Sequence, residues 1–370
     1  MMKFSCEKVL LQNAITVASR AVAPKSSIPA LEGLLLHAGS ALTVSGYDMK
    51  TGIRTQVSAD VTEGGDIVLN ARLFGDIIRR MPDDVVTFTA DDKMMVHLSC
   101  GDADFDILGL SAADYPDMPE VEDEYSMSIQ QKVLRAMIEE VAFAVSTNES
   151  RPVHTGALFE ISDAGLTVVA VDGFRLALRR EPLEHIDGGA FRFVAPGAAL
   201  NEVEKICADT DEMIHVIQGK RHLMFEAGTT QLICRRLEGE FLDYRNAIPM
   251  NHPIAIEVDN KVMLESLDRV SVVISEKLKS PVRCVFGEDR VFMSARTGNG
   301  EAKDICPVRG DGQNLEIGFN NRYLMDALRY APAEAVTMHL NTGISPCVIT
   351  PTDGSDSFLY MVLPVRLKAQ

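Results

Sequence analysis

Three segments of this chain share one pattern of apolar and polar positions, and they align with one another without a gap. The segments are residues 3–22, 127–146 and 256–275. Each starts with a short stretch of alternating apolar and polar residues, and apolar residues at helical spacing follow it. Lys8, Lys132 and Lys261 fall in register at the change of period. The pattern predicts a strand followed by a helix, repeated three times along the chain.

A second repeated pattern lies about midway between these segments. Residues 67–82 match residues 317–332, and residues 192–207 occupy the same place in the middle third with weaker similarity. The aligned charged residues are Arg72 and Arg322, Asp76 and Asp326, and Arg79 and Arg329, with Lys205 standing where Arg80 does. The chain is therefore expected to consist of six half-units of about 60 residues, two in each of three domains.

The helix expected within residues 67–82 separates apolar from charged positions. Its apolar side is predicted to contain Leu73, Phe74, Ile77 and Ile78. Arg72, Asp76 and Arg79 fall at i, i+4 and i+7 on the other side, and the aligned helix of the last third repeats this arrangement. Two interpretations of these charges stay open. They form either a solvated face with an Asp–Arg pair worth a few tenths of a kcal/mol, or a basic surface that repeats between domains.

Short β-rich runs separated by turn residues follow each helix of the first series. In residues 156–180, Asp163 to Gly165 and Asp172 to Gly173 mark two hairpin turns. The pattern recurs at residues 31–58 and 282–308. Each domain is then two strand–helix–strands halves, which bury their apolar surfaces with helices on one side and sheets on the other. The predicted fold class is α+β.

Two segments that interrupt regular structure predict the domain boundaries. Residues 119–125 are acidic and contain a proline, and residues 248–253 contain two prolines. The predicted domains are residues 1–124, 125–251 and 252–370, and each is long enough to bury its own core.

The composition is typical of a soluble intracellular protein. The chain has 370 residues, of which 46% are hydrophobic. It lacks both an apolar stretch near the roughly 18 residues of a membrane helix and a basic-then-apolar leader. We expect a cytoplasmic location without membrane association. The seven cysteines are scattered and never form a CxxC pair, so they are interpreted as buried thiols rather than disulfides or zinc ligands.

The net charge of −17 argues at first against a nucleic-acid partner, because such partners usually select an excess of lysine and arginine. The distribution of charge changes this conclusion, because the acidic residues gather in predicted strands, turns and linkers. The cations kept on the second-series helices are Arg72, Arg79, Arg80, Lys205, Arg322 and Arg329. One basic face within an acidic protein is therefore expected.

No common catalytic or nucleotide-binding motif occurs. The chain lacks GxxxxGK[ST], GxGxxG between strand and helix, HExxH and GxSxG. Asp102, Asp104 and Asp106 have the spacing of a calcium loop, but its glycine is missing and Ala113 replaces its last glutamate, which favours a strand with an acidic face. No catalytic residue, metal or cofactor is predicted. An enzyme with an interdomain active site and a monomeric interaction scaffold remain as alternatives.

Four further motifs occur in order along the chain. They are STNESRPVHTG at 146–156, VDGFRLAL at 171–178, GEFLDYRNAIP at 239–249 and YMVLPVRL at 360–367. Together with the triplication, they resemble the bacterial DNA polymerase III β subunits, the sliding clamp family. The resemblance implies a non-catalytic processivity factor in which two chains join head to tail into a ring, with helices lining the hole and sheets outside.

The same resemblance implies the partners. They are encircled duplex DNA, a second copy of the chain, the DNA polymerase III catalytic subunit, an ATP-driven clamp-loader complex, and other replication and repair proteins that bind clamps. The implied location is the cytoplasm, in association with the nucleoid. Simple geometry agrees with a dimer, because twelve helices set about 10 Å apart leave a hole of about 28 Å, whereas six leave about 9 Å. Duplex DNA, roughly 20 Å wide, passes only the larger hole.

The resemblance places a peptide-binding pocket between the central and last domains. The matching residues are His154, Val171, Gly173, Phe174, Arg175, Leu176, Leu242, Ala247, Ile344, Pro346, Met361, Leu363, Pro364, Val365 and Arg366. Without the resemblance, Asp172–Gly173 is only a hairpin turn, and Leu363 to Leu367 is an edge strand that contributes little to the core. The chain departs from the family pattern at Phe174, at Leu242, and in the extension Lys368, Ala369 and Gln370.

The resemblance also assigns two other sets of residues. Those expected to face DNA and contact phosphates without sequence preference are Lys25, Arg72, Arg79, Arg151, Lys205, Arg322 and Arg329. Those expected at the dimer interface are Phe105 and Ile107 of one chain and Val272 and Val273 of the other.

Overall fold

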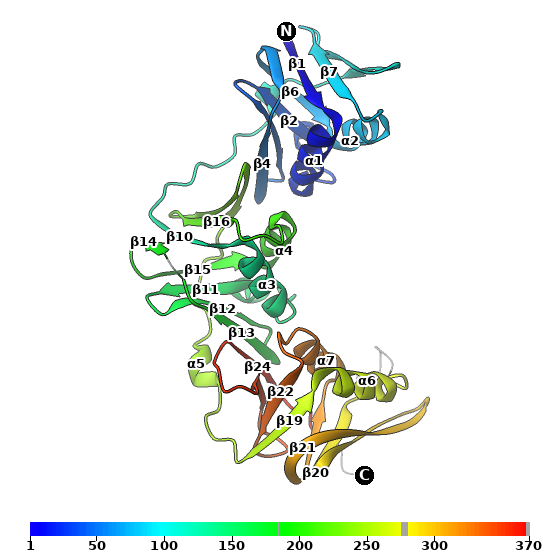
Figure 1. The fold of residues 1–370 in the computed structure, drawn as a ribbon, viewed down its shortest axis with the longest axis vertical. Coiled ribbons are helices and arrows are strands. Elements are labelled where there is room, and N and C mark those ends of the chain that lie inside the picture. The colour runs from blue at the N-terminus through cyan, green and yellow to red at the C-terminus, as the bar shows by residue number, and fades with distance from the viewer. Residues whose placement is uncertain (184, 275–279, 368–370) are drawn as a thin grey trace. The chain divides into compact units, whose positions relative to one another are not determined.

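The computed structural model describes residues 1–183, 185–274 and 280–367 (Figure 1). These residues form two compact units. The first unit contains Met1–Leu134, His185–Gly189 and Glu202–Arg236, and the second contains Arg135–Glu184, Ala190–Asn201 and Leu237–Gln370. The division falls inside the predicted central domain, so different segments of that domain belong to different units.

Both repeated patterns of the sequence are strand–helix pairs. The first series consists of β1 (Met2–Glu7) and α1 (Lys8–Ala18), β10 (Tyr125–Gln130) and α3 (Gln131–Ala142), and β19 (Ile254–Asp259) and α6 (Asn260–Ser271). The second series consists of β6 (Gly65–Asn70) and α2 (Ala71–Arg80), β15 (Phe191–Pro196) and α4 (Gly197–Ile206), and β21 (Gly300–Phe319) and α7 (Asn321–Arg329). Shorter helical segments are α5 (Tyr244–Ala247) and the 3-10 turns Ser19–Ala21, Pro29–Glu32, Ala112–Asp114 and Pro152–Thr155. The six predicted strand–helix units are confirmed.

Each first-series helix begins where its backbone is tied to the turn that follows the second-series helix. The bonds run from the amide of Lys8 to Asp84 O (3.0 Å), of Gln131 to Glu212 O (2.8 Å) and of Asn260 to Glu334 O (2.8 Å). Lys8 and Lys132 add ion pairs to Asp83 and Asp211, at 2.7 and 2.5 Å. Because the first amides of a helix have no partner inside the helix, these bonds satisfy them and join the two halves of each repeat.

The start and the buried side of α2 follow from its sequence with one exception. Asn70 caps the helix, since its side-chain oxygen accepts a hydrogen bond from the amide of Leu73 (3.0 Å). Phe74, Ile77 and Ile78 are buried as predicted, but Leu73 is 47% exposed. Its placement on the apolar side was wrong, because one residue turns the helix by about 100° and carries Leu73 beyond the face that packs on the sheets.

The first unit contains two antiparallel sheets. One has the order β5-β1-β7-β8-β9, with β5 (Asp60–Glu63), β7 (Val85–Ala90), β8 (Met95–Cys100) and β9 (Ala103–Leu108). The other has the order β14-β10-β16-β17-β18-β4-β3-β2-β6, with β2 (Gly33–Ala38), β3 (Leu42–Tyr47), β4 (Thr51–Val57), β14 (His185–Asp187), β16 (Met213–Gln218), β17 (His222–Ala227) and β18 (Thr230–Arg235). Because β4 pairs with β18, this sheet runs from the predicted first domain into the central one.

Apolar residues from both sheets and from α1 and α2 form one core in the first unit. Phe4 and Phe88 stack there with ring centroids 4.5 Å apart, and Leu11 of α1 and Phe74 of α2 are completely buried. The two helices lie side by side against the sheets (Figure 1). This packing leaves the charged side of α2 in solvent.

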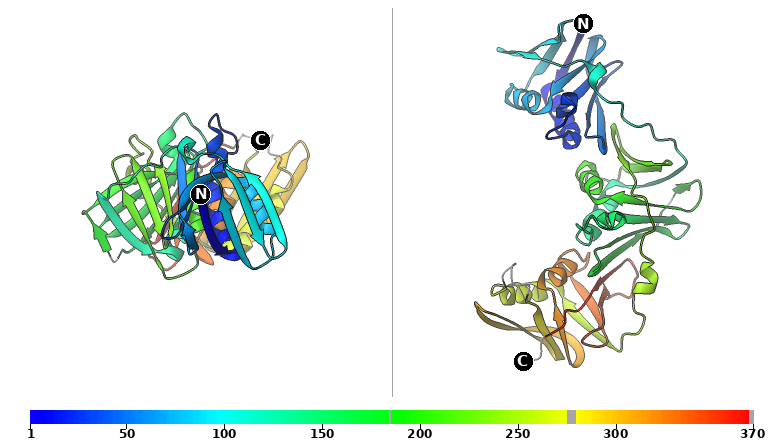
Figure 2. Two further views of the ribbon diagram at one scale, coloured as in Figure 1. Left: turned by 90° about the horizontal axis from the view of Figure 1, so that it is seen from above. Right: turned by 180° about the vertical axis from the view of Figure 1, so that it is seen from behind.

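The second unit contains a ten-stranded antiparallel sheet in the order β15-β11-β12-β13-β24-β23-β22-β19-β21-β20. Its further strands are β11 (Gly156–Ser162), β12 (Gly165–Val171), β13 (Arg175–Glu181), β20 (Val282–Thr297), β22 (Ala335–Leu340), β23 (Cys347–Pro351) and β24 (Phe358–Val362). The two hairpins predicted within residues 156–180 are confirmed as β11–β12 and β12–β13. The long β20–β21 hairpin ends the sheet on one side (Figure 2).

The last strand of the chain lies inside this sheet. β24 pairs with β13 on one side and with β23 on the other, and residues 363–367 leave the sheet as irregular chain. The expectation of an edge strand at Leu363 to Leu367 is therefore wrong. The neighbour that places β24 in the interior comes from the central domain, so the sequence of the last domain alone does not reveal it.

The burial of the cysteines agrees with the sequence analysis. All seven cysteines are buried, as predicted, and burial raises the pKa of the Cys234 thiol to about 12. Among the described residues, no group of three or more His, Cys, Asp or Glu side chains is placed to hold a metal ion. None of the described helices is both long and apolar enough to cross a membrane.

Candidate functional site

The β12–β13 turn presents an aromatic side chain at one end of the ten-stranded sheet. The side-chain Oδ1 of Asp172 accepts hydrogen bonds from the amides of Phe174 (2.9 Å) and Arg175 (3.1 Å). Gly173 has a φ of +88°, which glycine adopts without the strain of a Cβ. The turn leaves Phe174 57% exposed, although phenylalanine is among the residue types most often buried.

The chain after β24 is fixed against this turn. The amide of Leu363 donates to Phe174 O (2.9 Å), and the amide of Val365 donates to Gly318 O (2.7 Å). A Cβ at Gly318 would lie 2.5 Å from Val365 O, so only glycine allows this close approach. Residues 363–365 therefore hold a defined position next to the turn although they belong to no strand.

Three loops meet at the same end of neighbouring strands in this sheet. Arg175 at the start of β13 is paired with Val362 at the end of β24, and Val362 is paired with Cys347 at the start of β23. The turn before β13, the segment after β24 and the loop before β23 are therefore adjacent. These loops carry Phe174, Leu363 and Pro364, and Ile344 and Pro346, so the structure brings these predicted pocket residues together.

An apolar cluster lies beneath these loops. Its buried members include Val171, Leu176, Met361 and Tyr244, and half-buried Leu363 and Phe241 pack against them. His154 lies edge-on to the ring of Phe241 at 5.5 Å between centroids. Burial and the nearby Arg151 lower the pKa of His154, so its ring is neutral at pH 7.

Tyr244 positions the segment that carries two further pocket residues. Its hydroxyl donates to Glu160 (2.5 Å), and Arg245 also donates to Glu160 (2.6 Å). These bonds anchor α5, which places Leu242 and Ala247 on either side of Tyr244 along the chain. Leu242 is 45% exposed, and Ile344 in the β22–β23 loop is 78% exposed. The site thus has a buried apolar floor and exposed apolar side chains around it.

One predicted pocket residue, Arg175, turns its side chain away from solvent. The Arg175 side chain is only 9% exposed, and its guanidinium bonds to Asp172 and to Asp326 of α7 instead of reaching solvent. Arg366 is exposed, whereas Val365 is half-buried. The extension Lys368 to Gln370 lies outside the described residues.

Four residues at the site were not among the predicted pocket residues: Phe241, Tyr244, Tyr323 and Asp326. Tyr323 stacks on Phe174, with ring centroids 6.0 Å apart. One signal for it exists in the repeat, because Tyr323 occupies the position of Leu73 in the aligned first-domain segment. An aromatic residue where its repeat partner is aliphatic marks a place where the third domain differs.

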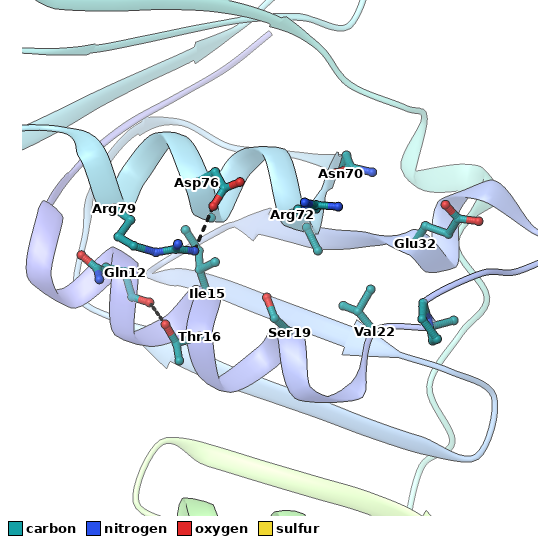
Figure 3. Close-up of a pocket in the computed structure, with 14 residues that line it drawn as sticks. Gln12, Ile15, Thr16, Ser19, Val22, Glu32, Asn70, Arg72, Asp76 and Arg79 are labelled. Atoms are coloured by element: carbon teal, nitrogen blue, oxygen red, sulfur yellow. Dashed lines mark hydrogen bonds and ion pairs between the residues drawn. The ribbon is translucent and has the colours of Figure 1, made fainter.

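The seven predicted DNA-facing cations are all exposed. They are Lys25, Arg72, Arg79, Arg151, Lys205, Arg322 and Arg329. Arg72 and Arg79 line a groove of about 670 Å³ between α1 and α2, and Gln12 and Thr16 of α1 line it from the other helix (Figure 3). Arg79 pairs with Asp76 of its own helix at 3.1 Å, and Lys205 pairs with Glu202 at 2.7 Å. Such exposed pairs exchange readily for phosphate contacts, because each is worth only about 0.2–1 kcal/mol.

The predicted dimer residues lie on the terminal strand β9 in the first unit and directly after α6 in the second. β9 is the last strand of the five-stranded sheet, and on it Phe105 is 37% exposed and Ile107 is half-buried. Asp106 on the same strand lies 2.9 Å from His97, which agrees with the predicted acidic strand. In the second unit, Val272 is 81% exposed directly after α6. The outer edge of a terminal strand presents unpaired N–H and C=O groups, which a strand of another chain can pair with.

Comparison with known proteins identifies the family of this chain. Models of the N-terminal, central and C-terminal domains of the DNA polymerase III beta subunit match residues 2–119, 128–243 and 245–366. The chain belongs to the β sliding clamp family. The Beta sliding clamp of Staphylococcus epidermidis is 30% identical over 377 residues, which cover 99% of this chain and 100% of that protein. That of Halalkalibacterium halodurans is 30% identical over 379 residues, with the same coverage.

Solved clamp structures have the same fold. The DNA polymerase sliding clamp of Bacillus subtilis superposes with a TM-score of 0.94 at 26% identity, covering 99% of this chain and 100% of that one. The DNA polymerase III beta subunit of Thermotoga maritima gives 0.91 at 28% identity, covering 100% of both chains. These matches confirm the α+β fold with three repeated clamp domains. The family is a non-catalytic processivity factor, so the alternative of an enzyme with an interdomain active site is excluded.

Proposed function

We propose that two copies of this chain form a ring that encircles duplex DNA, slides on it, and holds the replicative polymerase there. The observation that carries the proposal is the triplicated clamp domain, which spans the chain from end to end. In this proposal the domains are residues 1–124, 125–251 and 252–370. The ring works in the cytoplasm on the nucleoid. It binds the DNA polymerase III catalytic subunit, the clamp loader and other clamp-binding proteins in turn.

The exposed cations of the second-series helices give the inner face of this ring its affinity for DNA. Contacts to phosphates fix no sequence, so binding is uniform along the duplex. The excess of acidic residues elsewhere repels phosphate and discourages binding to the outside. Affinity then depends on a small number of cations on an otherwise acidic protein.

Replacing Arg72 and Arg79 with alanine should flatten the salt dependence of DNA binding. The slope of log affinity against log salt should decrease in magnitude by about 0.9 for each phosphate that the variant no longer neutralises. Fluorescence anisotropy with a short labelled duplex at several KCl concentrations measures this slope. The matched control replaces Arg290 and Arg309, two exposed arginines on β20 and β21. If both variants gave the same slope of log affinity against log salt, α2 would not be part of the surface that contacts DNA.

The apolar site at the end of the ten-stranded sheet is the proposed binding site for partner peptides. Its exposed apolar residues suit a peptide that carries glutamine followed by leucine and phenylalanine. Burying two or three such side chains, at about 1.5–3 kcal/mol each, gives exchangeable binding near micromolar after the cost of ordering the peptide. One site per chain would be shared by polymerase and loader in turn.

The double variant Leu242→Asp/Ile344→Asp should bind this peptide at least about 100-fold more weakly, because the two apolar side chains together represent roughly 3 kcal/mol or more of burial. Both residues are exposed, so the fold and the dimer mass should not change. Isothermal titration calorimetry measures the affinity, and primer extension on a long template should show correspondingly short products. Met250→Asp, at a residue that is 91% exposed but outside the site, is the control. Unaltered peptide affinity in the double variant would place the site elsewhere.

A further inference from the structure

Asp326 lies on α7 between Arg322 and Arg329, yet its carboxylate turns toward the β12–β13 turn. Its Oδ2 accepts a hydrogen bond from the guanidinium of Arg175 at 2.6 Å, and its side chain is 14% exposed. The nearest arginine of its own helix, Arg329, is 3.8 Å from its other oxygen. The shorter and more buried contact is the one with Arg175, so Asp326 connects a cation-bearing helix to the candidate pocket.

Arg175 also bonds to the β12–β13 turn, so it links Asp326 to that turn. Its Nε donates to Asp172 Oδ2 at 2.9 Å, while Asp172 Oδ1 accepts the amides of Phe174 and Arg175. The guanidinium also lies over the ring of Tyr323, 4.5 Å from its centroid, and Tyr323 stacks on Phe174. A continuous set of charged hydrogen bonds and ring contacts thus fixes Phe174 with respect to α7.

The aligned first-domain residue shows that this arrangement is not a general property of the repeat. Asp76 pairs with Arg79 of its own helix at 3.1 Å, and its side chain is 35% exposed. Leu73 stands there in place of Tyr323, so the ring that the Arg175 guanidinium covers has no counterpart at the aligned position. The carboxylate thus turns inward at Asp326, beside the candidate pocket, whereas that of Asp76 stays on a solvated helix face.

We propose that Asp326 is a positioning residue for the peptide pocket: it holds Arg175, and through Arg175 the Asp172–Phe174 turn, in the conformation that receives a partner's apolar side chain. This inference rests on the proposed function, because it requires a peptide that binds at this site. Asp326 also offsets the charge of Arg329, so one carboxylate serves the pocket and the DNA-facing helix. Its removal therefore weakens peptide binding and strengthens DNA binding.

The test compares Asp326→Asn with Asp76→Asn, which removes the same charge at the aligned position of α2. Asp326→Asn should weaken binding of the Gln-Leu-Phe peptide at least about tenfold, the loss expected for one charged hydrogen bond. Asp76→Asn should leave peptide affinity within about twofold of the native value. Both variants should bind a short duplex more tightly at a given salt concentration, because each removes one negative charge beside arginines.

A double-mutant cycle separates positioning through Arg175 from a general weakening of α7. If Asp326 acts through Arg175, Asp326→Asn should cost little further affinity in an Arg175→Met background, where the residue at 175 can no longer bond to the carboxylate. Circular dichroism checks folding, and Asp326→Glu, which keeps the charge, replaces Asp326→Asn if that variant unfolds. Failure of the native chain to bind peptide would overturn the proposed function itself. Native binding with an unaffected Asp326→Asn variant, or additive effects in the cycle, would overturn the positioning role alone.

Discussion

The double variant Ile107→Asp/Val273→Asp should sediment as a monomer of 40.5 kDa at micromolar concentration, whereas the native chain should sediment at twice that mass. Ile107 lies on β9 at the end of one sheet, and Val273 follows α6 in the second unit. A carboxylate buried without a partner costs several kcal/mol, and two-fold symmetry places each substitution in the dimer twice. Analytical ultracentrifugation gives the mass directly.

A variant at a more exposed position tests the interface with less risk of unfolding the chain. Ile107 and Val273 are half-buried, so charges there also disturb the monomer. Val272→Asp changes a residue that is 81% exposed, and it should weaken the dimer while the thermal midpoint of a dilute sample stays the same. Ile344→Asp, at 78% exposure but in the pocket, should leave the dimer intact. If the double variant kept the mass of a dimer, these residues would not form the interface.

The regular elements of this fold were predictable because their signals are local and repeated. The change from alternation to helical spacing at Lys8 and Lys132 marks real strand–helix junctions, and each lysine pairs with an acidic turn in its own domain. Repetition strengthened each prediction, because the same local chemistry recurs in every domain. The error at Leu73 arose at the margin of a helix face, where the spacing of apolar residues does not determine whether a side chain is buried or exposed.

The pocket was only partly predictable because it depends on contacts between distant segments. Arg175 and Asp326 are 151 residues apart in the chain, and nothing in either local sequence shows that they bond. The interior position of β24 has the same origin, since β13 of the central domain is its neighbour. Family resemblance supplied residues such as Leu176 and Met361, but it did not supply the direction in which the Arg175 guanidinium points.

Enclosure of DNA is the central claim, and it depends on the topology of the DNA more than on affinity. A closed ring leaves linear DNA by sliding off an end, whereas a nicked circle has no end. Contacts between the exposed cations and phosphates are weak and screened by salt, so at high salt they do not retain the protein on either form. Topology alone then determines how long the protein stays bound.

The most direct test measures retention of the labelled native chain on nicked circular plasmid after loading with a clamp loader and ATP. The complex is passed through a sizing column in high salt, before and after a restriction enzyme cuts the plasmid once. We expect the protein to elute with the circular DNA and to separate from it after linearisation. Equal loss from circular and linear DNA, or equal retention on both, would contradict enclosure.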